Sequence, residues 1–324
     1  MKLKLTAFLR LAAIAGLIAA TAGGAEAAFP DKPITLVVPF APGGGSDILG
    51  RIVGQKMSEI LGGEVVVENK PGAAGTLGSD VVSRAAPDGY TILLINTIAH
   101  SAAAVITPDV QYDPAKSFTA IGAIGDTQYL LIENPKFAPD YAAAVAKLKA
   151  EPGAYNFASS GIGGAPHLVM QLFMKETGVE MQHIPYGGSG PALNDVVSGT
   201  VPLIFENVAA TELIKAGQLK ALATTGDARQ SIFPDVPTFT EVGLKDFDIA
   251  AHWGLIAPAG VPDDAITALN DALSKALQDP KVAASLASQG IQPKPGSAGD
   301  YNALLATEAA RWAGVAKDAN LLPQ

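Results

Sequence analysis

Residues 34–47 read ITLVVPFAPGGGSD, a short apolar run that passes directly into a glycine-rich loop. The β-branched residues at 34–38 predict a buried strand, and Pro39 closes it. Apolar residues then recur at helical spacing from Ile48 to Ile60, which predicts a helix directly after the loop. The resulting order of strand, glycine loop and helix is the junction at which open α/β sheets bind ligands.

The same order of elements continues along the chain. Strands are expected at 64–68 and 90–95, with a helix through about Arg84 between them. This βαβαβ order implies a parallel sheet covered by helices. A second set of elements follows, with one or two strands at 118–132, further strands at 155–158, 181–185, 201–205 and 219–224, and helices at 141–150, to about Thr177 and to Val197.

The end of the chain is expected to return to the first set of elements. A strand at 251–256 precedes helices at 263–278, 281–289 and 298–317. We therefore predict an α/β protein with two lobes. Lobe 1 is discontinuous, formed by 29–125 and 248–324, and lobe 2 is formed by 126–247.

Composition excludes several classes of protein. The 324 residues are 48% hydrophobic and include no cysteine, which excludes disulfides, thiolate zinc sites and cysteine nucleophiles. No two of the 4 histidines are spaced as i, i+4, so no metal site is expected. The net charge of -9 and the lack of a basic run argue against nucleic acid as a partner.

Residues 1–28 have the pattern of a signal peptide. Basic residues precede an uncharged apolar run at 11–22, and a small-x-small pattern follows at 25–27. The run is shorter than the roughly 20 residues that span a bilayer, so a membrane anchor is the weaker alternative. Cleavage near Ala27 or Ala28 would leave 19 basic and 30 acidic residues, a net charge of -11. We expect an exported protein.

Glycine-rich loops recur at three predicted strand-to-helix junctions, at 40–47, 159–167 and 186–191. Glycine lets backbone N–H groups approach a ligand, and each following helix directs its positive dipole end at the same space. An acidic protein could bind a carboxylate in this way. Each loop could instead be only a turn with a helix cap, as Asp47 could be. Three such loops together favour an anion site, although none has a nucleotide-binding motif, and no cofactor is expected.

The candidate nucleophiles lack the arrangement that catalysis requires. Ser189 lies in GGSGP, whose last residue breaks the G-x-S-x-G motif. His167 follows Ser160 closely, but no triad order is present, and a histidine at a helix start usually bonds locally. We predict that the protein is not an enzyme.

The remaining polar and aromatic candidates have simpler interpretations. His183 is expected to be a hydrogen-bonded residue of the core or its rim, and Trp253 and Trp312 are expected to be packing residues. Asn207 directly follows the strand at 201–205, where its amide could bond a ligand or only cap the next turn.

Several segments of the chain resemble the periplasmic solute receptors of tripartite tricarboxylate transporters, also called Bug proteins. The resemblance covers essentially the whole chain after residue 28. Its most specific segments are VPFAPGGGSD at 38–47, ENKPGA at 68–73, APDGYT at 86–91, YNFASSG at 155–161, HIPY at 183–186 and DVPT at 235–238.

This resemblance implies a type II periplasmic-binding-protein fold, in which a carboxylate lies between two lobes and is held mainly by backbone amides and waters. The first lobe would contribute Ala41, Gly43, Gly44, Asp47 and Asn96 or Thr97. The second lobe would contribute Ser159, Ser160, Gly163, Gly164, His167, Tyr186, Gly187 and Gly188. The segments 96–99 and 163–166 depart from the family pattern by losing hydroxyl groups, so the far end of the ligand is expected to be less polar.

The predicted function is therefore a periplasmic receptor that binds a small mono- or dicarboxylate and delivers it to the membrane subunits of a transporter. We expect it to act as a monomer. Two alternatives stay open at this point: a receptor that serves a sensor, and a periplasmic hydrolase or isomerase on the same scaffold.

Overall fold

The computed structural model describes residues 29–108, 110–245, 247–319 and 321. The chain divides into two units after Asp31, and the second unit, residues 32–324, holds all the helices and strands of the described chain. The predicted signal peptide at 1–28 lies outside the described residues. Within the described ranges, no helix has both the length and the apolar character that crossing a bilayer requires.

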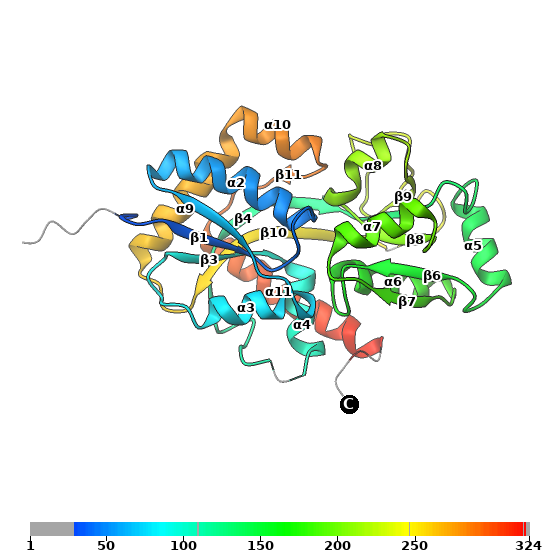
Figure 1. Cartoon of the computed structure of the whole chain (residues 1–324), viewed down its shortest axis with the longest axis horizontal. Helices are drawn as coiled ribbons and strands as arrows, with labels where there is room; N and C mark the ends of the chain where they lie inside the picture. Colours follow the sequence, from blue (N-terminus) through cyan, green and yellow to red (C-terminus); the bar gives the residue numbers. More distant parts are fainter. Residues whose placement is uncertain (1–28, 109, 246, 320, 322–324) are drawn as a thin grey trace, which may run out of the picture. The chain divides into compact units, whose positions relative to one another are not determined.

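The first sheet has six strands in the order β11-β4-β10-β3-β1-β2 (Figure 1). They are β1 (Ile34–Val38), β2 (Val65–Asn69), β3 (Thr91–Asn96), β4 (Phe118–Gln128), β10 (Ala250–Pro258) and β11 (Gln292–Pro293). β1 pairs in parallel with β2 and β3, as the βαβαβ pattern predicts. β10 pairs antiparallel with β3 and β4, so the sheet is mixed and the prediction of a parallel sheet holds for only part of it.

The second sheet has five strands in the order β7-β6-β8-β5-β9. They are β5 (Leu130–Glu133), β6 (Asn156–Ser159), β7 (Gln182–Pro185), β8 (Leu203–Glu206) and β9 (Lys220–Thr224). β6 pairs in parallel with β7 and β8, whereas β5 runs antiparallel to β8 and β9. The predicted strand region 118–132 is thus two strands, one in each sheet.

Helices flank each sheet. With the first sheet lie α2 (Gly45–Leu61), η1 (Ala73–Gly75), α3 (Thr76–Ser83), α4 (Thr97–Ile106), α9 (Asp263–Gln278), α10 (Pro280–Ser288) and α11 (Ala298–Asp318); the second sheet has α5 (Tyr141–Ala150), α6 (Ala165–Thr177), α7 (Ser189–Ser198), η2 (Val208–Ala210) and α8 (Thr211–Lys215). As predicted, the C-terminal helices return to the first sheet: α9 contacts α2 and β4, and α11 contacts α4 and β4.

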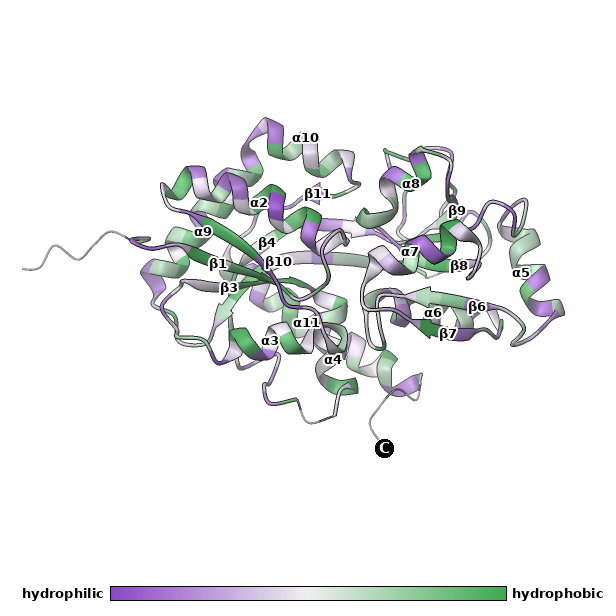
Figure 2. Ribbon diagram, viewed as in Figure 1, coloured by the Kyte–Doolittle hydropathy of each residue, from purple (hydrophilic) through white to green (hydrophobic). Residues whose placement is uncertain are grey.

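Each sheet has its own hydrophobic core. Val37, Leu93 and Ile256 belong to one buried cluster, and Leu130 and Ile204 belong to another. Figure 2 shows β1 as mostly hydrophobic, whereas α2 and α10 alternate between hydrophilic and hydrophobic residues. This pattern follows from position, because the strands lie between layers and the helices have one face in water.

The chain passes between the two sheets twice, through Tyr129 and through 225–249. Thr225 N donates to Tyr129 O, and Tyr129 N donates to Thr225 Oγ1, both at 2.8 Å. The two crossing segments are therefore bonded to each other where the sheets meet. The predicted lobe boundaries fall inside β4 and just before β10, and the division at those residues stays a prediction.

Candidate functional site

The first glycine loop lies against loops that follow strands of the second sheet. A Cβ placed on Gly188, after β7, would lie 3.0 Å from Ala41 Cβ. A Cβ placed on Gly45 would lie 3.2 Å from Val208 Cβ and 3.4 Å from Asn207 Oδ1. These close approaches place the junctions after β7 and β8 against the junction after β1.

A cavity lies where the junctions meet. It is lined by Phe40, Gly44, Gly45, Ser46, Asn96, Ala99, Tyr129, Ser160, Ala165, Pro166, Ser189, Glu206, Asn207 and Trp253. Its volume is about 30 Å³, which holds only a few water molecules. An organic acid could therefore occupy this space only after the facing loops move apart.

Three helices begin at this cavity. The N-cap residues of α2, α6 and α7 are Gly44, Gly164 and Gly188, and none provides a side-chain hydrogen bond to the helix. The cavity is lined by the first residues of all three helices. The first amides of a helix have no intrahelical partner and carry a partial positive charge, so their convergence creates an anion-binding environment.

Unpartnered polar side-chain atoms also gather here. Trp253 Nε1, Asn207 Nδ2 and Glu206 Oε2 are buried and make no hydrogen bond within the described chain. Asn207 Oδ1 accepts from Val208 N at 2.7 Å, so this residue caps η2 while its amide nitrogen stays without a partner. Trp253 was expected to be a packing residue, and its place in the cavity wall could not be inferred from its position in a strand. No lysine or arginine lines the cavity.

Asp47 holds the first glycine loop in place through hydrogen bonds. Its Oδ2 accepts from Gly43 N at 3.0 Å and from Arg51 Nε at 3.1 Å, and its Oδ1 accepts from Asn69 Nδ2 at 3.0 Å. Burial alone would raise the pKa of Asp47. The hydrogen bonds from Arg51, Gly43 and Asn69 have the larger combined effect and hold the pKa below its ordinary value. Asp47 therefore lies in helix α2, where it fixes the loop and does not act as the N-cap.

His167 and His183 support the loop after β6. His167 Nδ1 accepts from Gly163 N at 3.1 Å, and its ring stacks on His183 with centroids 3.9 Å apart. His183 Nε2 lies 2.6 Å from Ser159 Oγ, which fits the expectation of a hydrogen-bonded histidine. Burial lowers the pKa of His167 to about 3 and that of His183 to about 4, so both rings are neutral at pH 7.

The predicted site residues thus divide into those that line the cavity and those around it. Gly44, Asn96, Ser160 and Asn207 line it. The others form or support the surrounding loops. Ala41 faces Gly188, Gly43 N donates to Asp47, and Tyr186 donates to Asp195. A Cβ added to Gly187 would meet no atom within 4 Å, and Thr97 is buried at the start of α4. Ser159 ends β6, and Gly163, Gly164 and His167 lie at the start of α6.

Residues 49–321 match the model of the tripartite tricarboxylate transporter family receptor. The chain belongs to this family. It is 36% identical over 316 residues to protein BugT of Bordetella pertussis, covering 95% of this chain and 97% of that one.

Solved structures of similar receptors agree in fold. An R. palustris protein solved with adipate is 31% identical, with a TM-score of 0.88 over 91% of this chain and 100% of that one. MatC from Rhodopseudomonas palustris with bound malate is 32% identical, with a TM-score of 0.85 over 89% of this chain and 99% of that one. The receptor has the two-lobed type II periplasmic-binding-protein fold.

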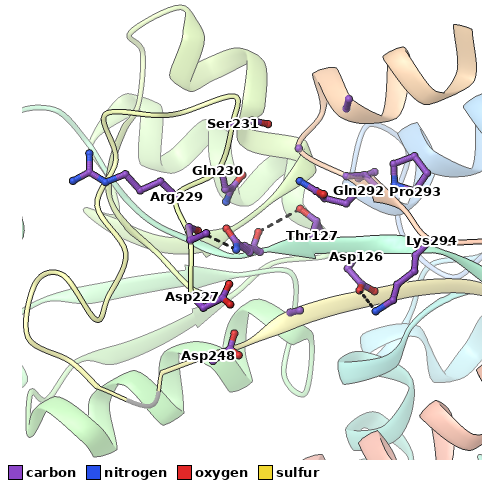
Figure 3. A pocket seen from close by; sticks show the side chains of 17 residues that line it. Asp126, Thr127, Asp227, Arg229, Gln230, Ser231, Asp248, Gln292, Pro293 and Lys294 are labelled. Carbon is purple, nitrogen blue, oxygen red and sulfur yellow. Dashed lines mark hydrogen bonds and ion pairs between the residues drawn. The ribbon is translucent and has the colours of Figure 1, made fainter. Parts of the chain in front are cut away.

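A larger cavity of about 670 Å³ lies elsewhere in the receptor, beside the segments through which the chain passes between the sheets (Figure 3). Its wall includes Asp126 on β4 and Lys294 after β11, which form an ion pair at 3.0 Å. Figure 3 shows Arg229 pointing away from the cavity. None of the predicted site residues lines it, and no helix of the described chain begins in its wall. The smaller cavity is therefore the candidate ligand site despite its volume.

The residues described include no group of three or more histidine, aspartate or glutamate side chains that could hold a metal ion. The polar groups at the candidate site are amides, hydroxyls, an indole N–H and the Glu206 carboxyl. Such groups bind a ligand through hydrogen bonds and helix dipoles.

Proposed function

We propose that this receptor captures a small mono- or dicarboxylate in the cavity between its two sheets and delivers it to the membrane subunits of a tripartite transporter. The observation that carries the proposal is the convergence of the N-termini of α2, α6 and α7 on one cavity. The adipate and malate found with two similar receptors support the class of ligand.

Main-chain amides would bind the carboxylate without a cationic side chain. A hydrogen bond to a charged group contributes about 1.5–3 kcal/mol. A few such bonds, offset by the cost of desolvating the anion, give affinities near micromolar, about -8 kcal/mol. This strength suits a receptor that must also release its ligand.

Ligand capture would involve a hinge motion of the two sheets. The facing loops must separate to admit the acid, because the cavity volume is only about 30 Å³. The segments that cross between the sheets, around Tyr129 and at 225–249, are where such a rotation would occur. A ligand that bonds loops from both sheets stabilises the closed arrangement through contacts that the open one lacks.

The Ser159–His183 pair gives no support to a catalytic role. Ser159 is fully buried, and neither residue lines the cavity. Ser159 Oγ is also bonded to the Gly161 backbone, donating to O and accepting from N at 3.1 Å. A nucleophile needs access to substrate, so we propose that the receptor is not an enzyme. We also propose that it is a monomer of the periplasm, exported by a signal peptide at 1–28 that is cleaved near Ala27 or Ala28.

The proposed function is tested with the mature chain in a thermal-shift screen of mono-, di- and tricarboxylates, amino acids and aromatic acids. A carboxylate should raise Tm in proportion to the logarithm of its concentration once it exceeds Kd. Calorimetry then gives the affinity of each compound that shifts Tm. A screen in which no carboxylate binds would contradict the proposal. Failure of the liganded receptor to support uptake by its membrane subunits would favour a sensor role.

A further inference from the structure

Glu206 is a buried carboxyl group at the candidate site that the proposed binding mode does not use. It ends strand β8 and is only 3% exposed. Its Oε1 accepts from Asn207 N at 2.9 Å, while Oε2 has no hydrogen-bond partner in the described chain. One oxygen is therefore fixed, and the other is available to a ligand in the cavity that this residue lines.

The groups around Glu206 in the cavity are neutral. α7 contributes Ser189, the crossing between β4 and β5 contributes Tyr129, β3 contributes Asn96, and β10 contributes Trp253. Tyr129 is the other titratable side chain in the cavity wall, and its pKa is raised by burial and by the Glu206 charge. The lining includes no lysine, arginine, histidine or aspartate that could pair with an ionised Glu206.

An isolated carboxylate is costly to bury, and the neutral acid is favoured instead. Burial raises the pKa of Glu206, although the nearby Ser189 hydroxyl and the Asn207 backbone amide oppose this shift. The neighbouring Asn207 Nδ2 and Trp253 Nε1 are donors without acceptors. Donors need an acceptor such as a carboxylate, which an ionised Glu206 beside them would repel.

We propose that Glu206 binds the ligand as a neutral carboxylic acid, whose Oε2–H donates a hydrogen bond to a carboxylate oxygen of the ligand. At the upper end of the pH range Glu206 of the free receptor is ionised and takes this proton from solvent, so anion capture there is accompanied by proton uptake. This role rests on the proposed function, and it makes Glu206 a residue that selects anionic groups over ammonium groups at this end of the site.

The expected consequence is that affinity falls as pH rises. Because the complex requires the proton and the free receptor releases it at high pH, the affinity should decline by at most about tenfold per pH unit. His167, which is buried, and His183, which is partly buried, have pKa values of about 3 and about 4, so they do not titrate between pH 6 and pH 8.5.

The test is calorimetry with malate and adipate between pH 6 and pH 8.5, in buffers of different ionisation enthalpy. The wild-type receptor should bind more weakly as pH rises, and the buffer dependence of the heat should report proton uptake that is small at pH 6 and grows toward one proton at pH 8.5. Glu206→Gln keeps an acceptor for Asn207 N and places an N–H donor at the other position. This variant should bind a carboxylate with no dependence on pH across that range.

Glu133→Gln is the matched control. Glu133 is also fully buried, on β5 of the same sheet, and burial raises its pKa to about 7, but it does not line the cavity. This variant should keep the wild-type pH dependence of binding.

Binding without proton uptake, or an unchanged pH dependence in Glu206→Gln, would overturn the role of Glu206 and leave the proposed function intact. Tighter binding at high pH, with preference for ligands that carry an ammonium group, would show an ionised Glu206 and also overturn it. Absence of carboxylate binding at every pH would contradict the proposed function itself. If Glu206→Gln does not fold, the proton count of the wild-type receptor decides.

Discussion

Asn96 Nδ2 donates a hydrogen bond of 3.0 Å to the Tyr129 hydroxyl, which ties the end of β3 to the crossing between β4 and β5. Both side chains are buried and both line the candidate site. The bond therefore links the ligand cavity to the segment around which the sheets would rotate. It also fixes the amide of Asn96, whose Oδ1 accepts from Ile98 N at 3.0 Å.

Removing the hydroxyl in Tyr129→Phe should destabilise the receptor by about 1–3 kcal/mol, because the buried Asn96 amide loses its acceptor. Urea unfolding at pH 7 measures this loss. Tyr155→Phe is the control: the Tyr155 hydroxyl donates to Glu151 at an exposed site, and its loss should change stability by less than about 0.5 kcal/mol. Equal effects of the two changes would contradict the structural role of the Asn96–Tyr129 bond.

The sequence predicts the local units well because their signals are local. The helices at 141–150 and 263–278 have the predicted bounds, since each is a periodic run with clear ends. The glycine loops at 40–47 and 186–191 likewise lie at strand-to-helix junctions, because a turn whose backbone requires glycine can be recognised from the glycines in the sequence. Helix α4 was missed because it follows β3 without a turn, and its run TIAHSAAAVI fits a strand or a helix.

The pairing of distant strands and the hydrogen-bond partners of the site side chains could not be predicted in this way. The antiparallel pairing of β10 depends on strands far apart in sequence, and the same is true of the side chains at the site. Trp253 and Glu206 carry no local mark of a binding role, because their lack of partners is a property of the folded neighbourhood. His167 matches the family pattern, yet its ring is engaged with Gly163 and His183 behind the loop.

Gly188→Ala should weaken ligand binding strongly. The residue has φ +154°, which strains an alanine, and its Cβ would lie 3.0 Å from Ala41 Cβ, so this loop would have to shift where it faces the first glycine loop. Overpacking of this kind costs about 1–3 kcal/mol, or roughly 5- to 150-fold in affinity. Gly187→Ala is the control, because no atom lies within 4 Å of its Cβ position. Calorimetry with malate and adipate compares them, and equal affinities would show that the loops need not close.

The histidine stack should make the receptor sensitive to acid. Burial depresses the pKa of His183 to about 4 in the folded state, so its contribution to stability is present above the ordinary value of 6.5 and is lost as pH falls toward 4. Between pH 7 and pH 5, wild type should lose roughly 1–2 kcal/mol more than His183→Gln. The raised pKa of Glu133 increases stability as pH falls, and it does so equally in wild type and in His183→Gln. The quantity to compare is therefore the difference in unfolding free energy between these two proteins. Parallel pH profiles would contradict this prediction.

The Asp126 cluster on β4 and β10 should contribute to stability through its partly buried partner His252. Asp126 Oδ1 lies 2.6 Å from His252 Nδ1, and Oδ2 lies 3.0 Å from Lys294 Nζ. Although burial raises the pKa of Asp126, these two partners lower it overall. Asp126→Asn should cost about 1–3 kcal/mol at pH 7. Lys294→Ala should cost less than about 0.5 kcal/mol, because the Lys294 side chain is 70% exposed. A larger loss for Lys294→Ala would reverse this assignment.

A crystal structure of the mature receptor grown with malate or adipate tests the central claim most directly. The ligand carboxylate should lie among the first amides of α2, α6 and α7, within hydrogen-bond distance of Asn207 Nδ2 or Trp253 Nε1 and without a lysine or arginine contact. A ligand bound instead in the larger cavity beside Asp126 and Lys294, or held by a cationic side chain, would contradict the account.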